Sequence, residues 1–143
     1  MLSPPGTPNA SDARSEDRKR ILVVDDEPLM GSAISRVLAE HEVVALTSAR
    51  SALCRISAGE SFDVILCDVM MPDFSGMDLY EAIARQAPEL LDRVVFMTGG
   101  AYTQDAITFL NRIPNARLEK PILPRVLHDA MASILPSGAT GAR

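Results

Sequence analysis

Five polar residues of this chain have side chains suited to phosphate or metal chemistry, and each stands at or near the end of a short apolar run. They are Asp25 and Asp26 after residues 21–24, Asp68 after 64–67, Thr98 after 94–97, and Lys120 near the end of 116–118. Carboxylate oxygens are ligands that Mg²⁺ prefers, and an ammonium or a hydroxyl can donate to phosphate oxygens. The five residues could therefore form one phosphate-binding and metal-binding site.

The charges of these residues indicate which chemistry is possible. Three carboxylates close together repel, and without compensation at least one would be pushed towards protonation. A hard divalent cation removes that conflict, and Mg²⁺ accepts two or three carboxylates together with a carbonyl oxygen. Phosphoryl transfer needs mainly positioning and charge neutralisation, so a carboxylate can serve as the nucleophile and become an aspartyl-phosphate.

The elements that must position these residues alternate along the chain. Continuous apolar runs predict buried strands, and apolar residues at helical spacing predict helices between them. The expected strands are residues 21–24, 43–46, 64–67, 94–97 and 116–118, and the expected helical stripes lie at 30–38, 52–56, 79–84, 107–110 and 126–134. Pro28 and Pro124 stand where a first helical turn would begin. This alternation predicts an α/β fold, a doubly wound parallel sheet with helices on both faces.

Such a sheet would bring the five polar residues together. In open parallel α/β sheets, ligands bind at the carboxyl ends of the strands, near the point where the winding direction reverses. The acids, Thr98 and Lys120 all follow the carboxyl ends of predicted strands. We therefore expect them to meet at one edge of the sheet.

Four segments in this order resemble the receiver domain of two-component response regulators, most of all the receivers of hybrid histidine kinases. They are residues 21–28, which end in Asp25-Asp26-Glu27-Pro28, then 63–76 around Asp68, 94–99 ending in Thr98-Gly99, and 118–121 ending in Lys120-Pro121. The resemblance runs over about residues 19–135. It implies a flavodoxin-like (βα)5 fold with strand order 2-1-3-4-5.

The resemblance also implies a role for each site residue. Asp68 is expected to be the phosphoacceptor, and Thr98 and Lys120 the switch hydroxyl and the phosphate-binding lysine. Asp25, Asp26 and Asp68 are expected to hold Mg²⁺, together with the backbone carbonyl of Met70. A cis peptide bond is expected between Lys120 and Pro121.

Function and partners follow from the same resemblance. The chain is expected to accept a phosphoryl group from a histidine kinase or a histidine phosphotransfer domain, and to change a protein-binding surface in response. It would catalyse only its own phosphorylation and dephosphorylation, and it could form a homodimer. Leu29, beside the stripe of the first helix, is a candidate contact for the phosphodonor. Arg117 departs from the family pattern, because many receivers have Tyr or Phe at that position.

Composition limits the other possibilities. The net charge of −5 argues against a nucleic-acid partner, and no apolar run reaches the length of a membrane span. No signal peptide is visible, so a cytoplasmic location is expected. Residues 1–19 and 136–143 are polar and read as flexible tails around a receiver domain at 20–135. His41 and His128 have no metal-ligand spacing, so we expect both at the surface.

Two further functions remain open at this point. A Mg²⁺-dependent phosphohydrolase of similar topology also uses an aspartyl-phosphate, but it typically shows Asp-x-Asp-x-Thr after the first strand, where this chain has Asp25-Asp26-Glu27-Pro28. A phosphate-independent interaction module of the same fold would need no acidic set. Nucleotide-binding glycine motifs are missing from the sequence.

Overall fold

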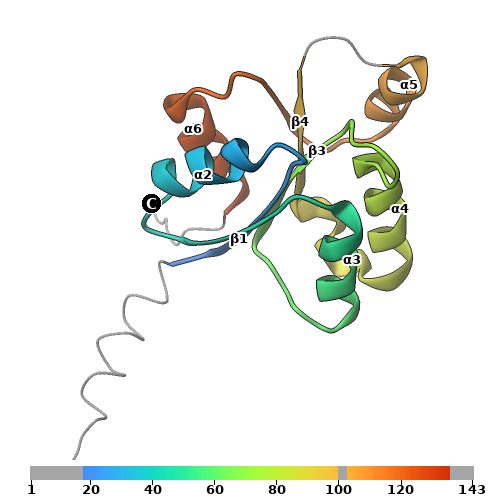
Figure 1. The fold of residues 1–143 in the computed structure, drawn as a ribbon, viewed down its shortest axis with the longest axis horizontal. Coiled ribbons are helices and arrows are strands. Elements are labelled where there is room, and N and C mark those ends of the chain that lie inside the picture. Colours follow the sequence, from blue (N-terminus) through green and yellow to red (C-terminus); the bar gives the residue numbers. More distant parts are fainter. Residues whose placement is uncertain (1–17, 100–102, 136–143) are drawn as a thin grey trace, which may run out of the picture.

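The computed structural model describes residues 18–99 and 103–135, and within them it forms a five-stranded parallel sheet with helices on both faces (Figure 1). The strand order is β2-β1-β3-β4-β5, with all four pairings parallel. The predicted fold and strand order are thus confirmed. The predicted flexible tails at 1–19 and 136–143 lie, apart from residues 18 and 19, outside the described residues.

The elements alternate in the expected sequence. The strands are β1 (Arg20–Val24), β2 (Glu42–Leu46), β3 (Val64–Asp68), β4 (Val94–Thr98) and β5 (Arg117–Glu119). The helices are α2 (Pro28–Val37), α3 (Ala49–Ser57), α4 (Gly76–Gln86), α5 (Gln104–Arg112) and α6 (Pro124–Ile134), with a short 3₁₀ helix, η1 (Pro88–Arg93), before β4.

The sheet separates two apolar cores. Alternate side chains of a strand point to opposite faces, so Ile65 and Cys67 of β3 pack on one side and Val64 and Leu66 on the other. Helices α3, α4 and α5 cover the first side, and α2 and α6 cover the second (Figure 1). The central strands are buried on both faces, and this explains why their sequences are continuous apolar runs.

Helix starts follow local chemistry that the sequence encodes. Pro28 and Pro124 occupy first-turn positions, where a missing N–H costs no hydrogen bond. At α4 the Ser75 hydroxyl accepts from the Asp78 N–H at 3.2 Å while the Asp78 carboxylate accepts from the Ser75 N–H at 3.0 Å. This capping box fixes where α4 begins, only a few residues after Asp68.

All five strands differ by one residue from the predicted bounds, and β1 and β2 begin one residue earlier, at Arg20 and Glu42. Asp68 and Thr98 are the last residues of β3 and β4 instead of the first residues beyond them. The ladder extends to both, because Asp68 lies opposite Met97 and Thr98 lies opposite Glu119. The same pairing places β5 one residue later than predicted. The ends of apolar runs therefore understate the strands where polar site residues belong to the ladder.

Candidate functional site

The strand register brings the predicted site residues to one edge of the sheet. Val24 of β1 lies opposite Cys67 of β3, so Asp25 follows β1 at the level of Asp68. On the other side of β3, the Lys120 N–H donates to the Thr98 carbonyl at 2.7 Å. The structure thus places all five polar residues at the carboxyl ends of β1, β3, β4 and β5, as the sequence predicted.

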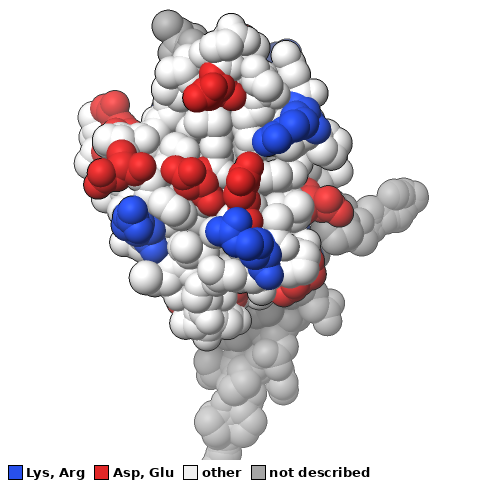
Figure 2. All heavy atoms as spheres, turned by 90° about the vertical axis from the view of Figure 1, so that its right-hand side faces the viewer, with Lys and Arg blue, Asp and Glu red and all other residues white. Residues whose placement is uncertain are grey.

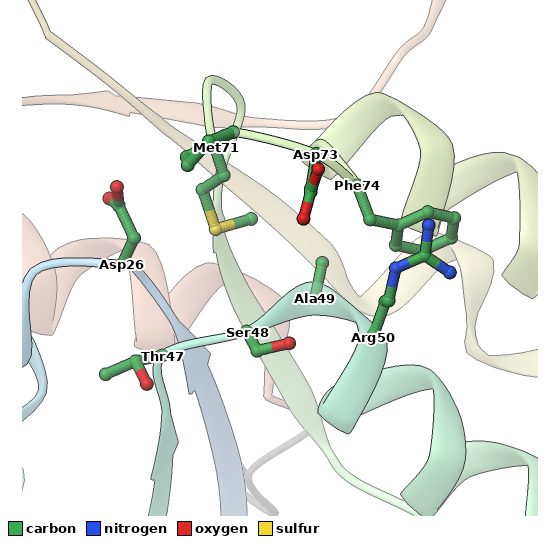
Figure 3. A pocket seen from close by; sticks show the side chains of 9 residues that line it. Asp26, Thr47, Ser48, Ala49, Arg50, Met71, Asp73 and Phe74 are labelled. Atoms are coloured by element: carbon green, nitrogen blue, oxygen red, sulfur yellow. The ribbon is translucent and has the colours of Figure 1, made fainter.

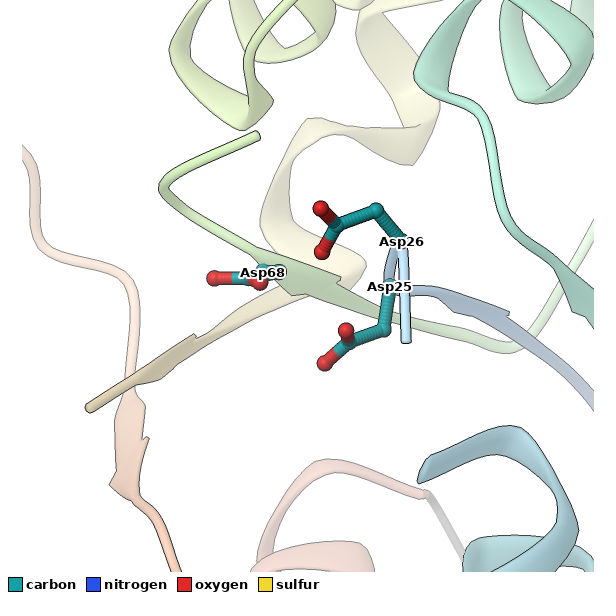
Figure 4. A group of neighbouring side chains, drawn as sticks. All are labelled: Asp25, Asp26 and Asp68. Atoms are coloured by element: carbon teal, nitrogen blue, oxygen red, sulfur yellow. The ribbon is translucent and has the colours of Figure 1, made fainter. Parts of the chain in front are cut away.

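The three aspartates form a tight cluster. Carboxylate oxygens of Asp25, Asp26 and Asp68 lie within 4.8 Å of one another. Figure 4 shows Asp25 and Asp26 at the end of β1 beside Asp68 on β3. Asp25 and Asp68 are buried, at 2% and 7% exposure, whereas Asp26 is exposed. Two of the three negative charges are therefore withdrawn from water.

Backbone amides hold the two buried carboxylates in place. The Glu27 N–H donates to Oδ1 of Asp25 at 2.9 Å, and the Met70 N–H donates to Oδ1 of Asp68 at 3.1 Å. Each carboxylate accepts from the residue two positions ahead, a local turn that aspartate favours. These bonds leave the second oxygen of each carboxylate directed at the centre of the site.

Lys120 supplies the positive charge at that centre. Its Nζ lies 2.7 Å from Asp25 Oδ2 and 3.3 Å from Asp68 Oδ2. The Lys120–Pro121 peptide bond is cis, as the resemblance implied. Gly99 lies against the lysine stem, and a Cβ there would come within 3.2 Å of Lys120 Cδ. A residue without a side chain at position 99 leaves that stem room to reach both acids.

Thr98 presents a buried hydroxyl at the same edge. Its side chain is 1% exposed, and within the described part of the chain its Oγ1 has no hydrogen-bond partner. A buried hydroxyl without a partner costs free energy, commonly about 1–3 kcal/mol. Such a group is an available donor for an oxygen atom that arrives at the site.

Burial and neighbouring charges act in opposite directions on the pKa values of Asp68 and Lys120. Burial raises the pKa of Asp68, and the Met70 N–H and the charge of Lys120 offset this only in part. Burial acts to lower the pKa of Lys120, but the hydrogen bond to Asp25 and the charge of Asp68 outweigh it and leave the pKa raised. Lys120 is therefore an ammonium at neutral pH, as binding an anionic group requires.

The donor set fits a divalent cation of the Mg²⁺ type. Three carboxylates within 4.8 Å carry three negative charges against the single ammonium of Lys120, and all their donor atoms are hard oxygens. An ion held by Asp25, Asp26 and Asp68 would remove the remaining repulsion. The predicted contribution of the Met70 carbonyl stays a prediction.

Replacing Asp26 by asparagine is expected to separate stability from metal binding. In Mg²⁺-free buffer the free energy of unfolding should rise by up to about 1 kcal/mol, because one of three clustered charges is removed. Affinity for Mg²⁺ should fall about tenfold or more, because a carboxylate ligand is lost. Chemical denaturation and calorimetric titration measure the two effects. The control is Asp129→Asn, at an exposed site on α6, which should change neither quantity. A lower stability of Asp26→Asn would show that the three carboxylates do not repel one another as proposed.

A pocket of about 210 Å³ opens beside the acidic cluster, between the loops that follow β2 and β3 (Figure 3). Asp26 forms one end. At the other end, the guanidinium of Arg50 lies 4.8 Å from the centre of the Phe74 ring. Sequence reasoning missed this contact, because Arg50 is at the start of α3 and Phe74 is in the loop before α4, and nothing in the sequence indicates that the two side chains meet. The pocket leaves open space beside Asp26.

Arg117 stands where many of the receiver domains that the sequence resembles have an aromatic residue, and here its side chain makes a structural contact. It is the first residue of β5, and its Nη2 donates to the Leu110 carbonyl at 2.7 Å. Leu110 lies in the last turn of α5, where carbonyl groups lack helical partners and a cation is favourable. Arg117 therefore ties β5 to the carboxyl end of α5.

The Arg117→Met variant should lower the free energy of unfolding by about 1 kcal/mol, because the aliphatic stem remains while the charged hydrogen bond is lost. Thermal or urea denaturation measures it. The control is Arg125→Met on the exposed side of α6, which should change stability by less than about 0.5 kcal/mol. Equal losses of stability in the two variants would show that the hydrogen bond from Arg117 to Leu110 does not stabilise the fold.

A family model described as "Response regulator receiver domain" matches residues 21–132. Among solved structures, a response regulator receiver domain protein from Clostridium thermocellum superposes with a TM-score of 0.71 at 28% identity, over 84% of this chain and 96% of that one. A CheY-like receiver domain protein from Methanospirillum hungatei gives 0.70 at 29% identity, over 81% and 92%.

Curated relatives are longer proteins. The transcriptional regulatory protein TcrA of Mycobacterium tuberculosis is 34% identical over 57% of this chain and 37% of its own length. The response regulator protein FleR of Pseudomonas aeruginosa is 32% identical over 79% of this chain and 24% of its own length.

Proposed function

Because the chain belongs to the response regulator receiver domain family, we propose that it is a phosphorylation-dependent signalling switch whose phosphoacceptor is Asp68. The observation that carries this proposal is Lys120, whose Nζ lies within 3.3 Å of Asp25 and of Asp68 at the edge where Thr98 also ends its strand. Nucleophile, cation and hydroxyl are thus already gathered around one small volume. The match of residues 21–132 to the family supports the same conclusion.

The chemistry uses few groups. An oxygen of Asp68 forms a bond to phosphorus while the bond from phosphorus to the donor nitrogen breaks, and the bonding pair leaves with that nitrogen. Lys120 neutralises charge on the phosphoryl oxygens, and the Thr98 hydroxyl donates to one of them. Bound Mg²⁺, held by Asp25, Asp26 and Asp68, would neutralise further charge on the transferred group.

The switch follows from the buried hydroxyl of Thr98. A phosphoryl group on Asp68 would accept a hydrogen bond from this hydroxyl, which has no partner within the described residues. That bond would stabilise a conformation in which the end of β4 has moved towards the phosphoryl group. A bonded state and an unbonded state of Thr98 are two conformations whose populations phosphorylation would shift. Arg117 is tied to α5 instead of filling an aromatic position, so we propose that the response passes to α5.

Amide spectra of ¹⁵N-labelled protein test the switch. With Mg²⁺ and acetyl phosphate, amides of β4 and α5 should shift, in addition to those around Asp68. Thr98→Val keeps the size of the side chain but removes the hydroxyl, and it should be phosphorylated while losing the shifts in α5. If the wild type is phosphorylated and no amide outside the acidic site shifts, then Asp68 accepts phosphate but the proposed conformational switch does not occur.

The alternatives are less well supported. The relatives named above are regulatory proteins, and receiver domains are in general signalling modules without a substrate of their own. We propose a cytoplasmic location and a histidine kinase or phosphotransfer domain as the donor.

Leu29 is the proposed contact for that donor. It lies in the first turn of α2, two residues after Glu27, and it is 71% exposed, which is unusual for a leucine next to a site. For a histidine kinase that phosphorylates the wild type, Leu29→Arg should lower the rate of phosphotransfer about tenfold, a typical effect of replacing one important interface residue. Phosphorylation by acetyl phosphate should stay unchanged.

The matched control is Ile107→Arg, because Ile107 is also an exposed apolar helix residue but lies on α5. Transfer from the kinase to this variant should proceed at the wild-type rate. If the kinase phosphorylates Leu29→Arg at the wild-type rate, Leu29 is not a contact for the phosphodonor. Equal slowing in both variants would point to a general effect of added charge.

A further inference from the structure

A groove runs between α4 and α5. Figure 2 views the molecule from the side on which Figure 1 places these two helices. The groove consists of two adjoining cavities of about 360 and 350 Å³. Both are lined by Glu81 of α4 and by Phe109 and Arg112 of α5. The three shared residues define the centre of the groove, which we call the α4–α5 groove.

The chain's own arginine already occupies this centre. The guanidinium of Arg112 lies 5.5 Å from the centre of the Phe109 ring, and its Nη2 lies 3.5 Å from Oε2 of Glu81. The side chains of Arg112 and Glu81 are 60% and 55% exposed. An ion pair so open to water contributes little to stability, so another cation can replace Arg112 at low cost.

The ring beneath the arginine is held firmly. Phe109 contacts Tyr80 and Phe96 edge-on, with ring centres 5.4 and 5.5 Å apart and interplanar angles of 88°. The Tyr80 hydroxyl in turn donates to Asn115 Oδ1 at 2.8 Å. Such aromatic contacts fix the orientation of a ring. Phe109 is therefore a rigid ring, 4% exposed with Arg112 over it, and displacement of Arg112 would open its face to another planar cation.

The two cavities of the groove differ in charge, and only one of them favours a cationic occupant. The cavity nearer the ends of the two helices is lined by Arg85 and Arg112, with Glu81 as its acid. The cavity nearer the starts of the two helices is lined by Asp78, Glu81 and Asp105, with Arg112 as its only basic residue. Asp78 already accepts in the capping box of α4, so Glu81 and Asp105 are the main attracting groups. Acidic side chains are spread over this face of the molecule in Figure 2, with basic ones between them.

We propose that the α4–α5 groove docks an arginine-bearing segment of a partner protein. The partner's guanidinium takes the place of Arg112, stacked on Phe109 and paired with Glu81, and a second cation of the segment lies near Asp105. Arginine fits better than lysine, because its planar group stacks on an aromatic face and pairs with a carboxylate at the same time. The inference does not depend on phosphorylation of Asp68.

A peptide titration followed by amide spectra tests the proposal. The probe is a short alanine-based peptide with two arginines one helical turn apart, and a second peptide carries lysine at both positions. Mg²⁺ is present throughout to occupy the acidic site, and the salt concentration is physiological to limit long-range attraction. The arginine peptide should shift amides around Glu81 and Phe109, and it should bind about threefold or more tightly than the lysine peptide.

Variants locate the binding. Glu81→Gln and Asp105→Asn should each weaken binding of the arginine peptide about threefold or more. Glu89→Gln, which removes the same charge from an exposed position on η1, should leave binding unchanged. Arg112→Ala should strengthen binding, because the competing side chain is gone. Arg125→Ala on α6 has the same effect on net charge and should not strengthen it.

Several results would overturn the proposal. Equal affinity for the arginine and lysine peptides would show attraction by charge alone, and so would equal effects of Arg112→Ala and Arg125→Ala. Shifts confined to other surfaces would move the contact elsewhere. Concentration-dependent shifts in the groove without peptide would assign it to a second copy of the chain instead of a partner.

Discussion

Replacing Lys120 by methionine is expected to slow phosphorylation of Asp68 by acetyl phosphate about a hundredfold or more. The ammonium lies 2.7 Å from Asp25 and 3.3 Å from Asp68, and it is the positive group best placed for the oxygens of an incoming phosphoryl group. Loss of one preorganised charge-stabilising donor typically costs a factor of about 10²–10³. Methionine keeps much of the length of the side chain without the charge, and the rate is followed by intact mass.

Lys19→Met is the matched control, because Lys19 is the other lysine of the chain and lies before β1. It should be phosphorylated at the wild-type rate. Binding of Mg²⁺ to Lys120→Met should be as tight as in the wild type or tighter, because a cation next to the carboxylates is gone. A Lys120→Met protein that is folded, binds Mg²⁺ and reacts within about threefold of the normal rate would contradict the role of this lysine.

Replacing Gly76 by alanine is expected to lower the free energy of unfolding by about 3 kcal/mol. Gly76 is the first residue of α4, where alanine would otherwise be slightly favourable. In this fold an added Cβ would overlap the carbonyl oxygen of Asp68 and would come within 3.0 Å of Val69 Cα and 3.1 Å of Cys67 Sγ. The nearest atoms are mainly backbone at the end of β3 and cannot move easily, so we expect a loss at the upper end of the range of about 1–3 kcal/mol that is typical of overpacking.

Gly99→Ala provides the comparison for Gly76→Ala. A Cβ at Gly99 would approach only the flexible side chain of Lys120, at 3.2 Å, so the loss should stay below about 1 kcal/mol. Urea denaturation of both variants measures the difference. Equal stabilities would show that α4 can shift away from β3, and the close packing of Gly76 on the phosphoacceptor strand would then not constrain the site.

The architecture could be predicted because burial strongly constrains the sequences of strands in a parallel sheet. Strands covered on both faces need unbroken apolar runs, and the runs before Asp25, Asp68 and Thr98 are of this kind. The end of β5 was harder to place, because Arg117 and Glu119 are exposed and only Leu118 is buried. An edge strand of three residues has little periodicity from which to read its bounds.

The site could be predicted because its members are separated in sequence but fixed by strand ends. Once the sheet is parallel, Asp25, Asp68, Thr98 and Lys120 must meet at one edge. Their exact contacts could not be predicted. Nothing in the sequence says that Lys120 approaches Asp25 more closely than Asp68, or that the Thr98 hydroxyl is fully buried. Those facts depend on how neighbouring loops pack.

Contacts between distant surface residues lay beyond sequence reasoning altogether. His41 was expected at the surface, but its side chain is only 12% exposed and its Nδ1 accepts from the Lys19 N–H at 3.0 Å. Arg50 of α3 lies over the ring of Phe74, which comes from the loop before α4. Such pairs follow no fixed spacing, because they depend on rotamers and on the angle between elements.

Intact mass after incubation with Mg²⁺ and acetyl phosphate tests the central claim most directly. The wild type should gain one phosphoryl group, and it should gain none when Mg²⁺ is chelated. Asp68→Asn, which keeps the size and shape of the side chain, should gain none under either condition. A wild type and an Asp68→Asn variant that gain the same phosphoryl group would contradict the account, because the acceptor would then be another residue.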